Sequence, residues 1–104
     1  MLCAHTVRRL KPGTFDRFVE AFMPSPENAP AGWVRFHMLR GLADENEVVT
    51  FGFFDGTLDE LERSQDDSDF ASLRDAIGPF VDAVIANGVY EIAATVTPDG
   101  AAAR

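Results

Sequence analysis

Residues 47–54 read EVVTFGFF, an unbroken run of β-branched and aromatic residues with the length of a strand. Residues of these types favour extended structure because their side chains pack well on a pleated surface. Successive side chains of a strand point to opposite faces, and here both faces receive large apolar groups: Val49, Phe51 and Phe53 on one, Val48 and Phe54 on the other. The run therefore predicts a strand that is covered on both sides.

The N-terminal part of the chain predicts a strand followed by a helix. Residues 2–10 are β-rich and end at the turn Lys11-Pro12-Gly13, after which Thr14 offers a side-chain oxygen to cap a helix. In that helix the large apolar residues recur at i, i+3, i+4 and i+7, namely at Phe15, Phe18, Val19 and Phe22. We expect this helix to bury one face and to expose the other.

A proline-rich loop separates this helix from a hairpin. Pro24, Pro26 and Pro30 prevent regular structure in the loop. A second strand then covers residues 33–40, and the polar connection 41–46 is short enough to join it to the EVVTFGFF strand as an antiparallel pair.

A helical region with a clear start follows the hairpin. Thr57 and Glu60 have the spacing of a capping box, in which each side chain satisfies a free backbone amide of the other residue. The helix is expected to begin at Leu58, to be interrupted at residues 64–67 and to restart near Ser68.

The C-terminal part predicts a longer helix and a fourth strand. Apolar residues continue at helical spacing through Leu73, Ile77 and Val84, with a bend at Pro79. Asn87-Gly88 is expected to end the helix, and residues 89–96 are expected to form the strand. Residues 98–104 are expected to be a flexible tail.

The order of elements predicts an α+β fold. It is a ferredoxin-like βαββαβ sandwich over residues 1–97, with a four-stranded antiparallel sheet and helices on one face. The helices can cover only one face, although residues 47–54 are apolar on both. A second copy packed sheet to sheet would bury the remaining apolar surface, so we expect a homodimer.

Charge and composition exclude several classes of function. The chain of 104 residues has a formal charge of −8, which repels the phosphates of nucleic acids. It has no apolar run of the roughly 18 residues that span a membrane, and its start does not have the pattern of a signal peptide, so we expect a cytoplasmic protein. The chain has a single cysteine and lacks the glycine motifs that bind nucleotides. We therefore predict that it binds no metal and no cofactor.

Two longer stretches resemble a known family. Residues 4–22, AHTVRRLKPGTFDRFVEAF, and residues 69–84, DFASLRDAIGPFVDAV, together with the hairpin between them, are similar to the antibiotic biosynthesis monooxygenase family of the dimeric α+β barrel superfamily. The resemblance covers residues 1–96. It implies two sheets paired into a barrel and a small-molecule pocket, either inside the barrel or between sheet and helices. Some members of the family oxygenate aromatic polyketides without flavin or metal.

Alternation along the strands indicates which side chains share a surface. In residues 33–40 the apolar set Val34, Phe36 and Met38 is expected to face the helices, which leaves on the other face Trp33, Arg35, His37 and Leu39. In the strand predicted at 89–96 the helix side would take Tyr90, Ile92, Ala94 and Val96, with Glu91 and Thr95 opposite. In residues 2–10 alternation does not decide which set of side chains faces the helices, and we place His5 on the face of His37.

His37 and His5 are the candidate catalytic residues. An imidazole can accept a phenolic proton near neutral pH, and the resulting anion is electron-rich enough to react with oxygen. The alternative is a histidine at an interface, which needs only a partner for each ring nitrogen. With Cys3 these histidines could bind a transition metal only if all three side chains converged, and we predict no metal site.

The candidate substrate-binding residues are Trp33, Arg35 and Glu91. The fork of Arg35 suits either a substrate anion or a carboxylate such as that of Glu91 across a dimer. Trp33 follows the proline-rich loop, where an aromatic ring would act as a cover over a pocket or as a packing anchor.

The sequence leaves several functions open. The first is a cofactor-independent monooxygenase that acts on a small aromatic or polyketide-like compound. The second is a non-catalytic dimer that binds or senses a small molecule, and a third is a structural dimer. A polyketide-cyclase-like enzyme also stays open, since the related stress-responsive barrel proteins often have a histidine in the first strand, as His5 is here.

Overall fold

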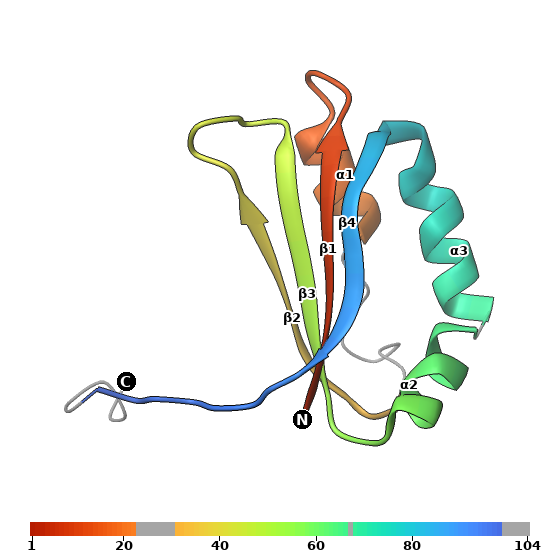
Figure 1. Ribbon diagram of the computed structural model, residues 1–104. Coiled ribbons are helices and arrows are strands. Elements are labelled where there is room, and N and C mark those ends of the chain that lie inside the picture. Colours follow the sequence, from red (N-terminus) through yellow and green to blue (C-terminus); the bar gives the residue numbers. More distant parts are fainter. Residues whose placement is uncertain (23–30, 67, 99–104) are drawn as a thin grey trace.

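The computed structural model describes residues 1–22, 31–66 and 68–98 (Figure 1). The elements in chain order are β1 (Leu2–Leu10), α1 (Phe15–Phe22), β2 (Trp33–Arg40), β3 (Glu47–Phe54), α2 (Leu58–Gln65), α3 (Ser68–Ile77), a 3₁₀ turn (Gly78–Phe80) and β4 (Val81–Glu91). The proline-rich loop and the tail beyond residue 98 lie outside the described residues. None of the described helices is long and apolar enough to cross a membrane.

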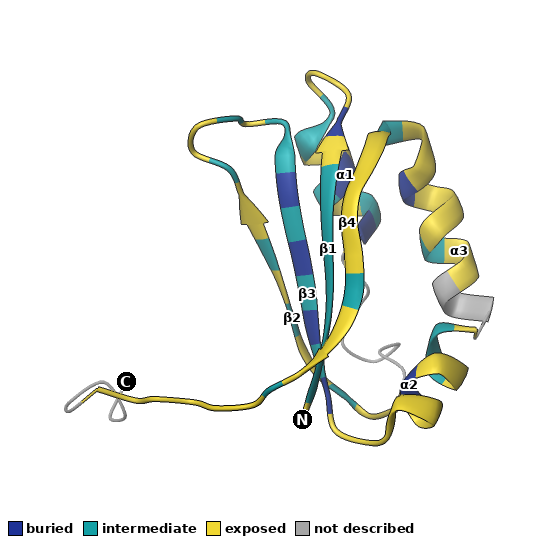
Figure 2. Ribbon diagram, in the orientation of Figure 1, coloured by how far each residue is buried: buried dark blue, intermediate teal, exposed yellow. Residues whose placement is uncertain are grey.

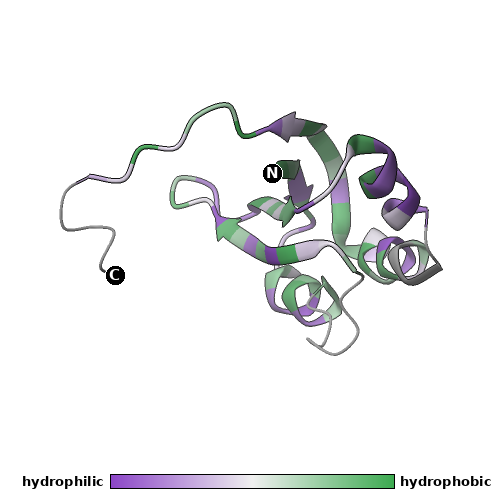
Figure 3. Ribbon diagram, turned by 90° about the horizontal axis from the view of Figure 1, so that it is seen from below, coloured by the Kyte–Doolittle hydropathy of each residue, from purple (hydrophilic) through white to green (hydrophobic). Residues whose placement is uncertain are grey.

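The predicted α+β fold is confirmed. The strands form one antiparallel sheet in the order β2-β3-β1-β4, which is the order of a ferredoxin-like βαββαβ sandwich. The helices cover one face of this sheet (Figure 1). Hydrophobic and hydrophilic residues alternate along the strands and around the helices (Figure 3).

The core lies between the sheet and the helices. Its buried members come from α1, β1, β3 and α3, namely Phe18, Phe22, Leu10, Val48 and Ile77. Phe18 and Phe22 stack with their ring centroids 5.7 Å apart, as expected for apolar residues one helical turn apart. The apolar spacing of α1 therefore predicts its buried face correctly.

The opposite face of the sheet has no cover within the described part of the chain. Along β3 the residues that face the helices are buried, while those that alternate with them are only half-buried (Figure 2). We call this surface the helix-free face; the strand pairing assigns to it Cys3, His5, Val7, Arg35, His37, Leu39, Val49, Phe51, Phe53 and Tyr90. Leu39 is 48% exposed and Tyr90 is 55% exposed. A single chain thus leaves a largely apolar sheet surface in contact with water.

The boundary between the second helical region and the fourth strand was predicted wrongly. The helix ends at Ile77, and the strand runs over Val81–Glu91 rather than over residues 89–96. Pro79 removes a helical hydrogen-bond donor, so the chain leaves the helix through the 3₁₀ turn. Val84, expected on the helix, instead lies opposite Arg8 of β1.

The Asn87-Gly88 pair is an ordinary part of β4 and not a stop signal. Asn87 lies opposite Thr6 and Gly88 opposite His5, so both residues continue the pairing with β1. The segment 92–98 lies outside the sheet and runs away from it (Figure 1). Pairing with a long neighbouring strand has overridden the local turn preference of these two residues.

The start of α2 is fixed by the predicted capping box. The Thr57 hydroxyl accepts a hydrogen bond from the Glu60 backbone amide at 3.2 Å, and the Glu60 carboxylate accepts one from the Thr57 amide at 3.0 Å. The backbone and side-chain hydrogen bonds from Thr57 lower the pKa of the Glu60 carboxyl.

Replacing the cap in Thr57→Ala is expected to lower the free energy of unfolding by about 1 kcal/mol, because a backbone amide loses its acceptor. Urea titration measures this loss. The pKa of Glu60, followed by NMR, should rise toward its ordinary value because the hydroxyl no longer donates to the carboxylate. An unchanged urea midpoint together with an unchanged Glu60 pKa would contradict the role of the cap.

Candidate functional site

A cavity of about 310 Å³ lies between the sheet and the helices. Its floor comes from the helix side of the sheet and includes Ala4, Thr6, Arg8, Thr50 and Gly52. Its walls are Phe22 of α1, Trp33 and Phe36 of β2, and Leu73 and Ile77 of α3. The lining residues Asn87, Val89 and Arg74 are exposed and mark its opening. The volume suits a small organic molecule.

Trp33 and Phe36 form an aromatic wall of this cavity. Their ring centroids are 5.0 Å apart and the rings are nearly parallel. The indole Nε1 of Trp33 donates a hydrogen bond to Ser64 Oγ of α2 at 2.8 Å, which fixes the ring plane. The outer face of a ring pair held in a fixed orientation can stack on a planar ligand.

Gly52 of β3 makes room for this wall. A Cβ atom added at Gly52 would lie 2.7 Å from the Phe36 ring and 2.8 Å from the Trp33 ring, closer than van der Waals contact permits. The glycine at the centre of an otherwise bulky strand therefore allows both rings to lie against the sheet.

The predicted face of Trp33 is wrong. Trp33 lies opposite Phe54 and Arg35 lies opposite Phe53, so Val34 is an extra residue that forms a bulge in β2. The bulge reverses the alternation on its N-terminal side and turns Trp33 toward the helices. Val34 is 55% exposed instead of facing the helices. Phe36, which follows the bulge, lies on the predicted side.

The cavity floor is polar. Arg8 Nη1 donates a hydrogen bond to Thr50 Oγ1 at 2.7 Å, and Thr6 Oγ1 donates to Asn87 Oδ1 at 3.1 Å. The Arg8 guanidinium also lies 5.8 Å from the centroid of the Phe22 ring. Burial lowers the pKa of Arg8, but an arginine stays protonated at neutral pH. The floor therefore presents a positive charge below an aromatic wall.

Sequence reasoning missed Arg8 as a site residue. The signal was nonetheless present, because an arginine three residues after His5 must lie on the opposite face of the same strand. With His5 on the helix-free face, the pairing places Thr6 and Arg8 on the helix side.

The predicted histidines and Arg35 lie together on the helix-free face. Phe51 has His5 on one side and His37 on the other, and the His37 ring stacks on it with centroids 5.0 Å apart. The Arg35 guanidinium lies 4.8 Å from the centroid of the Phe53 ring. The structure therefore brings His5, His37 and Arg35 to one surface, and the sheet separates that surface from the cavity.

The two surfaces of β4 are the reverse of those predicted. Tyr90 lies opposite Cys3, and its ring contacts that of His5 edge to face at 5.9 Å, so it belongs to the helix-free face. Glu91 lies opposite Leu2 on the other surface and is exposed. It does not share the face of Arg35, as an ion pair across facing sheets would require.

Several solved structures with similar folds are named as antibiotic biosynthesis monooxygenases. A proposed antibiotic biosynthesis monooxygenase from Nitrosomonas europaea superposes with a TM-score of 0.72 at 17% identity, over 88% of this chain and 97% of that one. A second, from Chloroflexus aurantiacus, gives 0.71 at 12% identity, over 86% and 89%. The chain has the fold of antibiotic biosynthesis monooxygenases. SnoaB of Streptomyces nogalater, a cofactor-independent oxygenase, also shares the monooxygenase fold, with a TM-score of 0.65 at 18% identity over 94% and 97%.

The TM-scores show the monooxygenase fold, whereas identities of 12–18% do not show the activity. No family model matches the sequence, and no curated protein matches it either. Any function must therefore be argued from the side chains that the fold brings together.

In this monooxygenase fold, the described residues include no group of three His, Cys, Asp or Glu side chains that could hold a metal ion. Cys3 and His5 do share the helix-free face, as the Cys3-x-His5 pattern predicts. Burial raises the pKa of the Cys3 thiol, which disfavours the thiolate that a metal would need.

Proposed function

We propose that this protein is a cofactor-independent monooxygenase that acts on a small aromatic or polyketide-like compound bound in the cavity. The observation that carries the proposal is the combination of an aromatic wall, formed by the stacked rings of Trp33 and Phe36, with a polar floor at Arg8, Thr6 and Thr50. Such a pocket can stack an aromatic ring and orient an oxygen substituent. The fold shared with a cofactor-independent oxygenase supports the same reading.

The reaction can balance without a cofactor. When a CH₂ group activated by neighbouring rings is oxidised to a carbonyl by O₂, one oxygen atom enters the product and the other leaves as water. The electrons come from the substrate, whose anion is the species that reacts with oxygen. The cavity contributes by orienting the substrate.

The position of the base depends on which surface binds the substrate. A general base must lie within about 3 Å of the proton that it removes, or act through one water. His37 and His5 lie on the far side of the sheet, so they can act as bases only for a substrate held between two helix-free faces. The described lining of the cavity contains no histidine and no carboxylate. A substrate in the cavity must therefore be acidic enough to ionise there.

That lack of a base in the described lining also favours a second candidate function, a non-catalytic dimer that binds a small aromatic molecule. Oxygen uptake with anthrone, whose CH₂ lies between two rings, separates the two functions. The monooxygenase should consume one O₂ for each anthraquinone formed, at a rate above that of anthrone alone. Saturable anthrone binding that raises the melting temperature without oxygen uptake would instead identify a binding protein. Ring closure of a linear polyketide substrate would identify a cyclase.

The variant His37→Gln tests whether the reaction takes place in the cavity or on the helix-free face. For a substrate in the cavity we expect anthrone oxidation within about twofold of the wild type, since the sheet separates His37 from the cavity. His5→Gln serves as the matched variant on the same face. A fall in turnover of about 10² to 10⁴, with the melting temperature unchanged, would place the reaction on the helix-free face and make His37 its base.

We also propose that the working unit is a homodimer. The helix-free face is largely apolar, and its partner in the assembly would be the same face of a second copy. Arg35 and His37 are exposed in the single chain and would become part of the interior of the dimer.

A further inference from the structure

The charge of the cavity is opposite to that of the protein. The chain has 17 acidic residues against 9 Lys and Arg. Among the described residues that line the cavity, however, the charged ones are two arginines, Arg8 in the floor and Arg74 at the opening. In a chain with this excess of acid, a described lining whose charged side chains are all positive indicates a ligand of negative charge.

Arg8 has unused capacity to bind such a ligand. The described residues provide ion pairs for Arg9 and Arg40 but none for Arg8. The hydrogen bond to Thr50 uses one of the five N–H donors of its guanidinium. Removal of a charge from water is costly unless the charge is paired, and the rings of Phe18 and Phe22, at 5.9 and 5.8 Å, compensate only in part.

We propose that the cavity selects aromatic compounds that carry an ionised oxygen group, a carboxylate or a phenolate, and that Arg8 binds this group. The proposal rests on the cavity of the proposed function and specifies its substrate class. The ring of the ligand stacks on Trp33 and Phe36, while its anionic oxygen receives charge-assisted hydrogen bonds from the guanidinium.

This arrangement also explains how the cavity can favour an anion although its described lining contains no base. A positive charge beside a bound phenol stabilises the phenolate and lowers the pKa of the ligand. Arg8 would thus bind and orient the reactive form of the substrate, and the proton would leave to water at the opening.

The test compares two probes of nearly equal shape, 2-naphthoate and its neutral analogue 2-naphthamide. Calorimetry at neutral pH should show the anion bound about 10- to 100-fold more tightly than the amide by the wild type. Arg8→Gln should remove most of this preference by weakening naphthoate binding, with little change for naphthamide. Arg8→Lys keeps the charge and should retain part of the preference.

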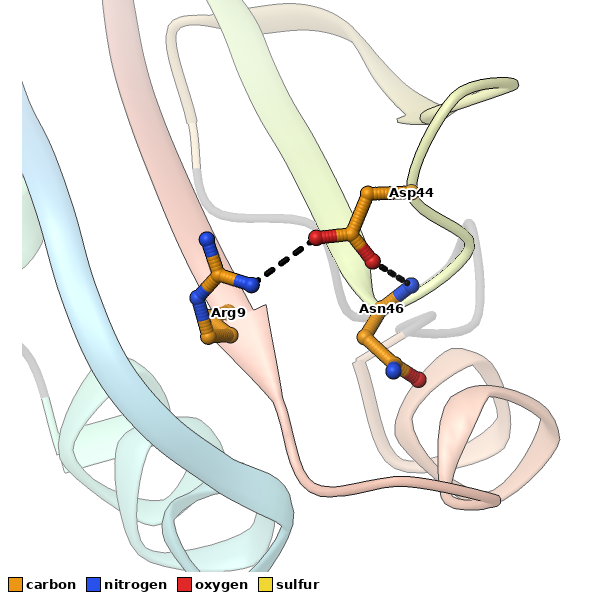
Figure 4. A network of polar contacts seen from close by, with 3 residues as sticks. All are labelled: Arg9, Asp44 and Asn46. Atoms are coloured by element: carbon orange, nitrogen blue, oxygen red, sulfur yellow. Dashed lines mark hydrogen bonds and ion pairs between the residues drawn. The ribbon is translucent and has the colours of Figure 1, made fainter.

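Arg9 provides the matched control. It precedes the end of the same strand, points away from the cavity and is held by Asp44, with Arg9 Nη1 2.8 Å from Asp44 Oδ2 (Figure 4). The other Asp44 oxygen accepts a hydrogen bond from the Asn46 amide at 3.0 Å. Arg9→Gln removes the same formal charge from the protein and should leave both affinities within about twofold of the wild type.

Equal binding of the two probes by the wild type would overturn the proposal, and so would binding of neither probe by the folded protein. An equal loss of naphthoate affinity in Arg9→Gln would also overturn it, because the effect would then come from net charge. Comparison of the two probes on the wild type remains decisive even if Arg8→Gln does not fold.

Selective naphthoate binding without oxygen uptake would refute the monooxygenase and leave this inference standing. Oxidation of anthrone at the same rate by the wild type and by Arg8→Gln would refute the role of Arg8 and leave the monooxygenase standing.

Discussion

Phe51→Asp is expected to abolish assembly of the dimer. The wild type, with a chain mass of 11.4 kDa, should sediment at low micromolar concentration with about twice that mass. Phe51 lies at the centre of the helix-free face, between His5 and His37. An aspartate there would bury an unpaired charge on assembly, at a cost of several kcal/mol. The variant should sediment as a monomer or fail to fold.

The control for this experiment is Leu42→Asp. Leu42 lies in the connection between β2 and β3 and is fully exposed, so the same change of charge should leave both mass and stability unaltered. A wild type that sediments as a well-folded monomer would contradict the argument from the uncovered sheet face. A dimer that survives Phe51→Asp would show that assembly uses another surface.

Gly52→Val is expected to have the second large effect. Even the first added carbon would lie within 2.8 Å of both Phe36 and Trp33, so the rings must move off the sheet or the strand must shift. We expect a loss of about 1–3 kcal/mol in the free energy of unfolding, as in other overpacked sites. We also expect loss of naphthoate binding, because the displaced rings no longer form the wall of the cavity. Trp33 is the only tryptophan of the chain, so its fluorescence reports the displacement directly.

Gly78→Ala is the matched control, since an added Cβ at Gly78 meets no atom within 4 Å. It should leave both binding and the fluorescence spectrum unchanged. Unaltered naphthoate affinity in a stable Gly52→Val protein would show that the aromatic wall does not contact the ligand.

Local signals were sufficient to predict most of the fold. The capping box at Thr57, the apolar spacing in α1 and the composition of β3 each specify one element without reference to the rest of the chain. The start of β4 was not predictable in this way. Residues 81–89, VDAVIANGV, satisfy both helical and strand spacing, and only the pairing with β1 decides between them.

The candidate site was less predictable because it depends on which face each side chain occupies. Alternation alone left the face of His5 ambiguous, and it is the pairing of His5 and His37 with Phe51 that places them on one face. The cavity wall did not follow from alternation either, because nothing in the local sequence marks Val34 as the extra residue of a bulge. Glu91 was placed wrongly because its face was assigned from Ile92, Ala94 and Val96, which lie beyond the end of β4.

The bulge in β2 also affects how this chain can be aligned with others of its fold. β2 is an edge strand, so an extra residue there interrupts pairing with β3 alone and leaves the rest of the sheet unchanged. At identities of 12–18%, an alignment without a gap through β2 shifts every position before Val34 by one residue against a relative that lacks the bulge. Such an alignment would assign Trp33 to the helix-free face and its neighbour Val34 to the helix side, the reverse of what the structure shows for Trp33.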